Sequence, residues 1–212
     1  MTLLPTMLFD GARKRSHTFV FAHGAGAPMD SPFMVAFAEG LVKAGLCVGR
    51  FEFPYMQTRR KEGSKRPPDR GPKLEEAWRE AIADIRAGLP KGGKLVIGGK
   101  SMGGRIASLV ADDQGVDGLV CLGYPFHPPG RPEKTRTEHL ADLKTPTLIV
   151  QGTRDTMGGQ EAVAGYSLSG SIGLHWLEDG DHSFKPRKKS GRTEEQNWSE
   201  GIQAAADFIQ SL

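Results

Sequence analysis

Apolar positions recur along the chain with two spacings, and segments of the two kinds alternate. Short continuous apolar runs that end at glycine or other turn-forming residues are typical of buried strands. Such runs predict strands at 18–22, 46–53, 94–98, 116–122 and 147–151, and a weaker last strand that ends at Leu177.

The segments between these runs carry apolar residues at every third or fourth position, which is the spacing of one helix face. The clearest stripe runs from Leu74 to Leu89. Ser31 followed by Pro32 has the residue types of a helix start, so we expect Ser31 to cap a helix there. Further helices are predicted over 102–113 and near the C-terminus.

Short apolar strands that alternate with amphipathic helices favour an α/β fold, with a mostly parallel sheet covered on both faces. The 212 residues fit one domain, and we expect 1–212 to form it without a linker or repeat. The 24 residues from 123 to 146 can form at most a small cap. In such sheets ligands gather at the carboxyl ends of the strands.

Composition excludes several classes of protein. With 38% hydrophobic and 25% charged residues, the chain is neither disordered nor fibrous. No apolar run approaches the roughly 20 residues that cross a bilayer, so we expect no membrane association. Arg13, Lys14 and Arg15 follow the first apolar stretch, the reverse of a secretory signal, and this predicts a cytoplasmic protein. Cys47 and Cys121 lie in apolar runs and are expected to be buried free thiols.

The formal net charge of +3 is distributed unevenly. Residues 58–73 hold seven Lys or Arg against two acids, and 185–192 hold five and no acid. Such segments indicate an anionic partner or substrate, or simply solubilising loops. Neither interleaves aromatic residues, so no nucleic-acid partner is expected. The first segment contains three prolines and is predicted to be a long loop.

One motif in the sequence predicts a catalytic nucleophile. Gly99-Lys100-Ser101-Met102-Gly103 matches G-x-S-x-G and lies between a predicted strand and a predicted helix, as a nucleophile elbow requires. The glycines leave room for neighbouring backbone at a sharp turn. The N–H of Met102, at the helix start, faces the group that Ser101 would attack. Ser101 is therefore the candidate nucleophile, and the N–H of Met102 a candidate oxyanion donor.

A serine hydroxyl needs a base, and the base needs a carboxylate that fixes its tautomer. Of the six histidines, His182 lies in a turn after the last strand. Asp155 follows the strand at 147–151 through a turn and is the candidate carboxylate. Asp179 and Asp181 are the alternatives, although they are too close to His182 in sequence to reach its far ring nitrogen easily.

His23-Gly24-Ala25-Gly26 follows the first strong strand and resembles the H-G-G-G loop that supplies a second oxyanion donor. The N–H of Ala25 is the first choice for that donor, and the N–H of Gly26 the second. His23 is expected to shape this loop and to contact the substrate. A glycine-rich turn without chemistry is the alternative interpretation.

Together these segments resemble the α/β-hydrolase superfamily from about Thr18 onward, including its Ser…Asp…His chain order. More narrowly, the chain is similar to the small KANSL3/Tex30-type hydrolase-like proteins at 23–30, 59–68, 99–104, 123–128, 151–155 and 179–182. The resemblance implies a single domain with a mostly parallel sheet of about six to eight strands, minimal or no lid, and a Ser101/Asp155/His182 triad. It supplies no substrate, and some relatives serve in larger assemblies rather than as enzymes.

Two functions follow as hypotheses. The first is a serine hydrolase, similar to a carboxylesterase, that acts on small acyl esters without a metal or organic cofactor. The second is a non-catalytic binding or scaffold protein that uses its basic segments for an acidic partner. Within the first, Arg59 and Arg60, with Lys65 and Arg66, are hypothesised to bind a carboxylate or phosphate of the substrate. Monomer and homodimer both stay open.

Overall fold

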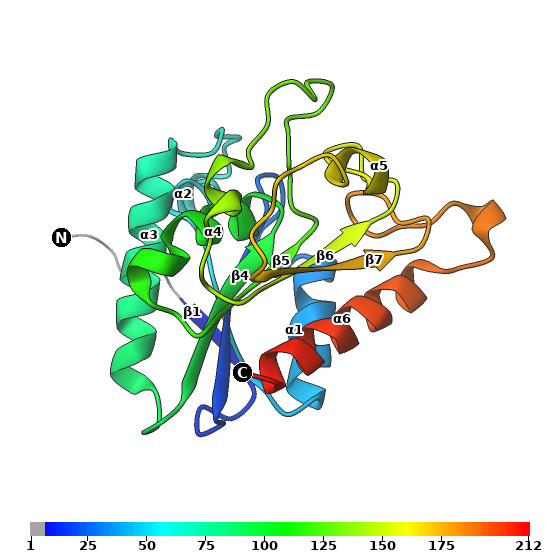
Figure 1. Ribbon diagram of the computed structural model, residues 1–212. Coiled ribbons are helices and arrows are strands. Elements are labelled where there is room, and N and C mark those ends of the chain that lie inside the picture. The colour runs from blue at the N-terminus through cyan, green and yellow to red at the C-terminus, as the bar shows by residue number, and fades with distance from the viewer. Residues whose placement is uncertain (1–6) are drawn as a thin grey trace.

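The computed structural model describes residues 7–212 and shows a seven-stranded sheet with helices on both faces (Figure 1). The strands are β1 (Met7–Asp10), β2 (His17–Ala22), β3 (Cys47–Phe51), β4 (Lys94–Lys100), β5 (Gly118–Leu122), β6 (Thr147–Gly152) and β7 (Ile172–Leu177). The helices are α1 (Pro32–Lys43), α2 (Pro54–Glu62), α3 (Gly71–Gly88), α4 (Met102–Gln114), α5 (Gln160–Val163) and α6 (Glu194–Gln210), with 3₁₀ turns at Glu138–Ala141 and Lys188–Ser190.

The strands lie in the order β1-β3-β2-β4-β5-β6-β7. Every neighbouring pair is parallel except β1 with β3, which is antiparallel. The connections between consecutive parallel strands contain α-helices, except that from β5 to β6, which contains a 3₁₀ turn. The carboxyl ends of these strands share one edge of the sheet. The predicted α/β fold with a mostly parallel sheet is confirmed, and the edge strand β1 is an addition to it.

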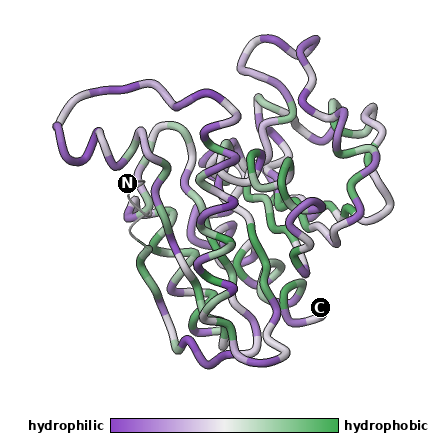
Figure 2. The backbone as a smooth tube through the Cα atoms, turned by 90° about the vertical axis from the view of Figure 1, so that its left-hand side faces the viewer, coloured by the Kyte–Doolittle hydropathy of each residue, from purple (hydrophilic) through white to green (hydrophobic). Residues whose placement is uncertain are grey.

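Two apolar cores hold the layers together. On one face α3 and α4 pack against each other and the sheet, with Trp78 and Ile106 fully buried or nearly so. On the other face α1 and α6 pack together, with Phe37 and Ile209 completely buried. Figure 2 shows the hydrophobic stretches gathered in the interior and the hydrophilic stretches in outer loops. Both faces of the sheet are therefore shielded from water, as the continuous apolar strands require.

The basic segment at 58–73 is not one long loop, and that prediction is wrong. Its first residues belong to α2, which starts with Pro54 at the first helical position and ends at Gly63 with φ 67°. Proline is preorganised for a helix start, and glycine readily adopts the left-handed conformation after a helix end. Only 63–70 is irregular before α3 begins.

Smaller predictions had mixed outcomes. Ser31 occupies the N-cap position of α1 and Pro32 begins the helix, as predicted, but the Ser31 side chain makes no capping hydrogen bond within residues 7–212. Cys47 and Cys121 are buried free thiols, as predicted. Residues 123–146, all of which the structure describes, contain a 3₁₀ turn and form no separate cap domain. No helix within residues 7–212 is long and apolar enough to cross a membrane.

Candidate active site

A cavity of about 660 Å³ opens at the carboxyl edge of the sheet. Ser101, which directly follows β4, and His182, from the loop after β7, both line it. Apolar side chains form much of the wall: Phe33, Met34, Leu74, Ile106, Pro125 and Met157. This is the position in which open α/β sheets bind ligands.

Ser101 sits on a strained turn between β4 and α4. Its φ of 52° and ψ of −115° lie in a region that non-glycine residues rarely adopt. A Cβ at Gly99 or at Gly103 would lie 2.4 Å from the carbonyl oxygen of Ala22, so both positions require glycine. Trp78 supports the turn from α3 by donating its indole N–H to the Gly103 carbonyl at 3.2 Å. The G-x-S-x-G pattern therefore has the steric role that the sequence predicts.

The structure brings Ser101, His182 and Asp155 into one chain of hydrogen bonds. His182 Nε2 lies 2.8 Å from Ser101 Oγ, and His182 Nδ1 lies 2.7 Å from Asp155 Oδ2. An ionised carboxylate can only accept, so Nδ1 carries the proton and Nε2 accepts from the serine hydroxyl. This is the tautomer that a general base for Ser101 needs.

The surroundings keep the His182 imidazole neutral. Burial lowers the pKa of His182, the hydrogen bond from Nδ1 to Asp155 raises it, and the nearby Lys100 cation lowers it again; the net direction is downward. Lys100 donates from Nζ to the His182 carbonyl oxygen at 2.5 Å. Burial lowers the pKa of Lys100 to about 8. At neutral pH, His182 is therefore able to accept a proton.

Gln151, which the sequence analysis did not single out, holds Asp155 in place. It is fully buried at the end of β6, and its Nε2 donates to Asp155 Oδ2 at 2.9 Å. Its Oε1 accepts the N–H of Tyr124 at 2.7 Å, which ties the ends of β5 and β6 together. The other carboxylate oxygen of Asp155 accepts the N–H of Met157 at 2.8 Å. A polar residue at the end of an otherwise apolar strand is the signal that could have found Gln151.

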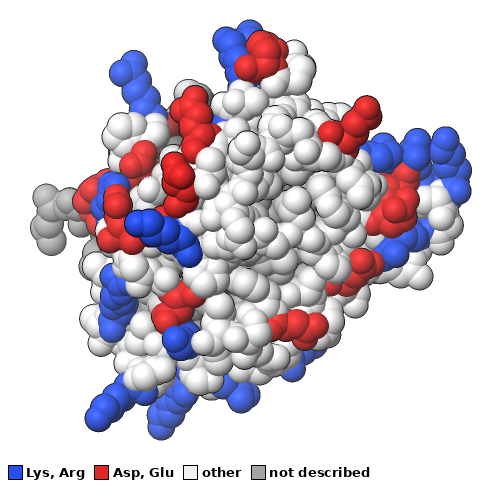
Figure 3. All heavy atoms as spheres, in the orientation of Figure 1, with Lys and Arg blue, Asp and Glu red and all other residues white. Residues whose placement is uncertain are grey.

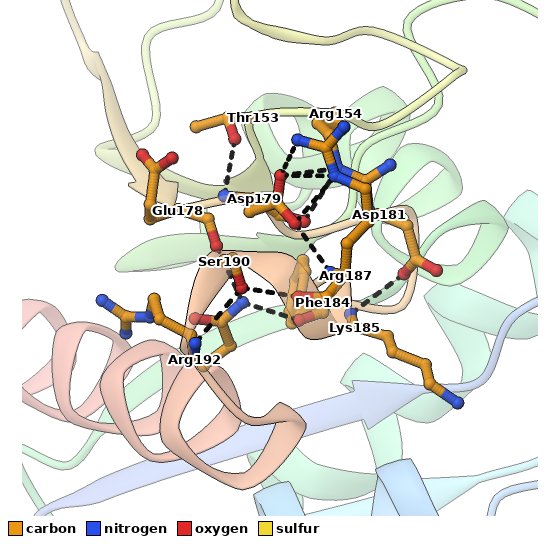
Figure 4. A network of polar contacts seen from close by, with 11 residues as sticks. Thr153, Arg154, Glu178, Asp179, Asp181, Phe184, Lys185, Arg187, Ser190 and Arg192 are labelled. Atoms are coloured by element: carbon orange, nitrogen blue, oxygen red, sulfur yellow. Dashed lines mark hydrogen bonds and ion pairs between the residues drawn. The ribbon is translucent and has the colours of Figure 1, made fainter.

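Asp179 anchors the loop that carries His182, as Figure 4 shows. Its carboxylate accepts the backbone N–H of Arg187 at 2.7 Å and the Nε–H of the same residue at 2.8 Å, and pairs with Arg154 at 3.0 Å. The bond from Arg187 lowers the pKa of Asp179 to about 2. Phe184 and Asp179 have φ of 70° and 54°, a strained pair that this network holds.

Asp179 and Asp181, the alternative carboxylates, thus support the backbone of the loop. Asp181 accepts the N–H groups of Ser183 and Lys185 at 2.8 and 3.0 Å, and the ring of His182 bonds to Asp155 instead. Part of the basic segment 185–192 is also paired rather than simply solvated. In Figure 3, Lys and Arg side chains at the end of the molecule where Figure 1 places this segment lie beside Asp and Glu side chains.

The two residues whose N–H groups are the predicted oxyanion donors lie at the cavity. Met102 and Ala25 both line the cavity, and within residues 7–212 neither backbone N–H donates a hydrogen bond. A Cβ at Gly24 would lie 3.6 Å from the Cβ of Ser101, so the loop passes close to the nucleophile. Tyr55 fixes that loop by donating its hydroxyl to the Ala25 carbonyl at 3.0 Å.

The structure does not bring His23, Arg59 and Arg60 to the cavity wall. His23 is completely buried, donates from Nδ1 to the Gly24 carbonyl at 2.7 Å, and accepts the N–H of Phe53 at 3.1 Å. It shapes the loop, as expected, but cannot contact a substrate. None of the three is among the residues that line the cavity.

Arg60 is neutralised within the fold. Its guanidinium donates to Glu52 at 2.5 Å and to Asp30 at 2.9 Å.

For metals, no group of three or more His, Cys, Asp or Glu side chains between residues 7 and 212 is arranged to hold an ion.

Comparisons with known proteins identify the family and the fold. The family model described as "Alpha/beta hydrolase domain" matches residues 15–210. An alpha-beta serine hydrolase homologue from Coxiella burnetii is 19% identical, with a TM-score of 0.73 over 97% of this chain and 90% of that chain. A dienelactone hydrolase from Anabaena variabilis is 22% identical, with a TM-score of 0.73 and the same coverage, 97% and 90%. A serine hydrolase without lid from Xanthomonas campestris is 20% identical, with a TM-score of 0.69 over 93% and 88%. At these identities the three structures show a shared fold.

Proposed function

The chain belongs to the α/β-hydrolase family, and on this premise we propose that it is a serine hydrolase that cleaves small carboxylic esters. The observation that carries the proposal is the chain of hydrogen bonds from Ser101 through His182 to Asp155 at the cavity wall. Hydrogen bonds link three residues from three distant segments there, and this arrangement supports an activated nucleophile.

The reaction follows from these contacts. Ser101 Oγ attacks the ester carbonyl carbon while His182 Nε2 takes the hydroxyl proton, and Asp155 stabilises the imidazolium. The carbonyl electrons move onto oxygen, and the N–H groups of Met102 and Ala25 donate to this oxyanion. His182 then gives its proton to the leaving alkoxide, which leaves an acyl-enzyme on Ser101. Water attacks the acyl group, with His182 again as base, and releases the acid and the free serine.

The alternative, a scaffold protein that keeps the elbow only as fold architecture, has weaker support. Scaffolding does not require the hydrogen bonds that link Ser101, His182 and Asp155 at the cavity wall. The basic segments, which that alternative would use, are partly paired with acids of the same chain. The narrower resemblance to KANSL3/Tex30-type proteins, a cytoplasmic location and the lack of a nucleic-acid partner stay predictions.

The test is labelling with a small fluorophosphonate, read as intact mass. We expect one adduct on the wild-type protein and none on Ser101→Ala. Ser31→Ala is the matched control, because Ser31 also lines the cavity but makes no bond to a histidine; it should still be labelled. Folded wild-type protein that takes no label, or Ser101→Ala that keeps it, would overturn the proposed function.

A further inference from the structure

Two arginines line the cavity beside Ser101 and are not paired with acids. Arg105 lies on α4, and Arg136 lies in the segment between β5 and β6. Within residues 7–212, neither guanidinium makes an ion pair. Neither arginine belongs to the basic segments that stand out in the sequence.

Arg105 is placed one helical turn after the nucleophile. Its backbone N–H donates to the Ser101 carbonyl at 3.0 Å, which is the i to i+4 bond of the first turn. Side chains four residues apart share a helix face, and the Cα–Cβ bond tilts toward the helix N-terminus. Arg105 is therefore on the helix face that follows Ser101, and it lines the same cavity. Its Nε is buried and has no hydrogen-bond partner within residues 7–212.

Arg136 extends from a backbone that is held on both sides. Its N–H donates to the Phe126 carbonyl at 2.7 Å, and its carbonyl accepts the hydroxyl of Tyr124 at 2.9 Å. Both partners come from the chain just after β5, at the carboxyl edge of the sheet. Burial lowers the pKa of Arg136, and the nearby Arg105 cation lowers it further. The charge of Arg105 therefore acts on Arg136, and both residues line the same cavity.

Two partly buried cations without a carboxylate partner are unfavourable, because each loses hydration and repels the other. The one acid on the cavity wall, Asp69, already accepts the N–H of Tyr55 at 3.0 Å and pairs with Lys73 at 2.9 Å. A bound anion would offset both costs. The planar fork of arginine matches a carboxylate through two parallel hydrogen bonds.

We propose that Arg105 and Arg136 form a subsite for a carboxylate of the substrate, so that the preferred substrates are acidic esters. This inference rests on the proposed function and deepens it, because it assigns a substrate class to the same cavity. The subsite replaces the one that the sequence placed at Arg59 and Arg60.

Paired substrates test the inference. On the acyl side we would compare the mono(para-nitrophenyl) ester of glutaric acid with its methyl ester, and on the alcohol side meta-acetoxybenzoate with its methyl ester. Wild-type protein is expected to prefer the carboxylate form of at least one pair, measured as the ratio of kcat/KM values. Arg105→Gln and Arg136→Gln should each lower that ratio by about 10- to 100-fold, the effect of losing one hydrogen bond to a charged group.

Arg131→Gln is the matched control, because Arg131 is exposed in the same segment; its ratio should equal that of the wild type. Calorimetric titration of monomethyl glutarate into Ser101→Ala reads binding without catalysis, and binding should be lost when Arg105→Gln is added. Binding without any ester hydrolysis by the wild type would support the subsite and refute the proposed function. Hydrolysis of neutral esters without preference or binding would overturn the subsite and leave the proposed function intact.

Discussion

Two groups of arginines lie near the carboxyl ends of the strands, and they differ in the charges that surround them. Arg60, on α2, bonds to the buried Glu52 and to Asp30, so its charge is neutralised within the fold. Arg105 and Arg136 line the cavity and have no carboxylate partner within residues 7–212. Arg60 therefore stabilises the fold, whereas the charges of Arg105 and Arg136 are available to a bound ligand.

Whether a basic side chain is paired with an acid, rather than the local density of charge, therefore marks a binding site. Residues 58–73 hold seven basic side chains, but several of them form ion pairs with acids of the same chain. The pairs, besides Arg60 with Glu52, are Arg66 with Glu62 and Lys73 with Asp69. The cavity arginines lie in no basic run, and only the fold shows that their guanidinium groups lack an acid.

An acid introduced beside the cavity arginines should neutralise them as Glu52 neutralises Arg60. Arg136→Glu removes one guanidinium and places a carboxylate beside Arg105, which makes this region resemble Arg60 with Glu52. The preference for carboxylate esters should fall by about 100-fold or more, because both contacts to the substrate anion are lost. The measurement is the ratio of kcat/KM for the acidic and methylated esters. Arg131→Glu makes the same charge change on the exposed part of the segment, and an equal fall in both variants would refute a local effect.

The converse change removes the acid from the paired group. Glu52→Gln takes the charge from a carboxylate that is 2% exposed and sets an amide against the Arg60 guanidinium. Because the Arg60 side chain is 48% exposed, water offsets part of the loss, and we expect a fall of about 1–3 kcal/mol in the free energy of unfolding by urea.

The substrate preference of Glu52→Gln should equal that of the wild type. Glu62→Gln breaks the exposed pair with Arg66 and should change the free energy of unfolding by only about 0.5 kcal/mol or less. If Glu52→Gln were as stable as Glu62→Gln, or changed the preference, the two arginine groups would not have separate roles.

Much of the fold could be predicted from the sequence, because its signals are local. The parallel strands are continuous apolar runs, and α3 carries a stripe at helical spacing. Elements with little buried surface were not predicted. The edge strand β1 is only four residues long, and α2 buries just Tyr55 and Met56, so neither leaves a periodic pattern.

The residues of the candidate site also fall into those that the local sequence predicts and those that it does not. Ser101, Asp155 and His182 each follow a strand end, and a parallel sheet brings strand ends to one edge. Gln151 and Arg105 were missed because their roles depend on contacts across the fold: one bonds to Asp155, and the other lacks an acid. Whether a charge is neutralised depends on residues that may be far apart in sequence, as Arg60 and Asp30 are.

Lys100 permits a finer test, because this third cation of the cavity wall acts on His182 rather than on a ligand. The pKa of Lys100 is about 8, so it is charged throughout the pH range in which His182 titrates, below 6.5. The proposed reaction requires neutral His182, so we expect activity to be lost as pH falls through the pKa of His182. Lys100→Met removes a charge that lowers this pKa, so the acid limb of kcat/KM should move to higher pH. Lys185→Met, which removes an exposed cation from the loop that carries His182, should leave the acid limb at the wild-type pH. A limb that stays in place in both variants would show that burial alone, without the Lys100 charge, sets the lowered pKa of His182.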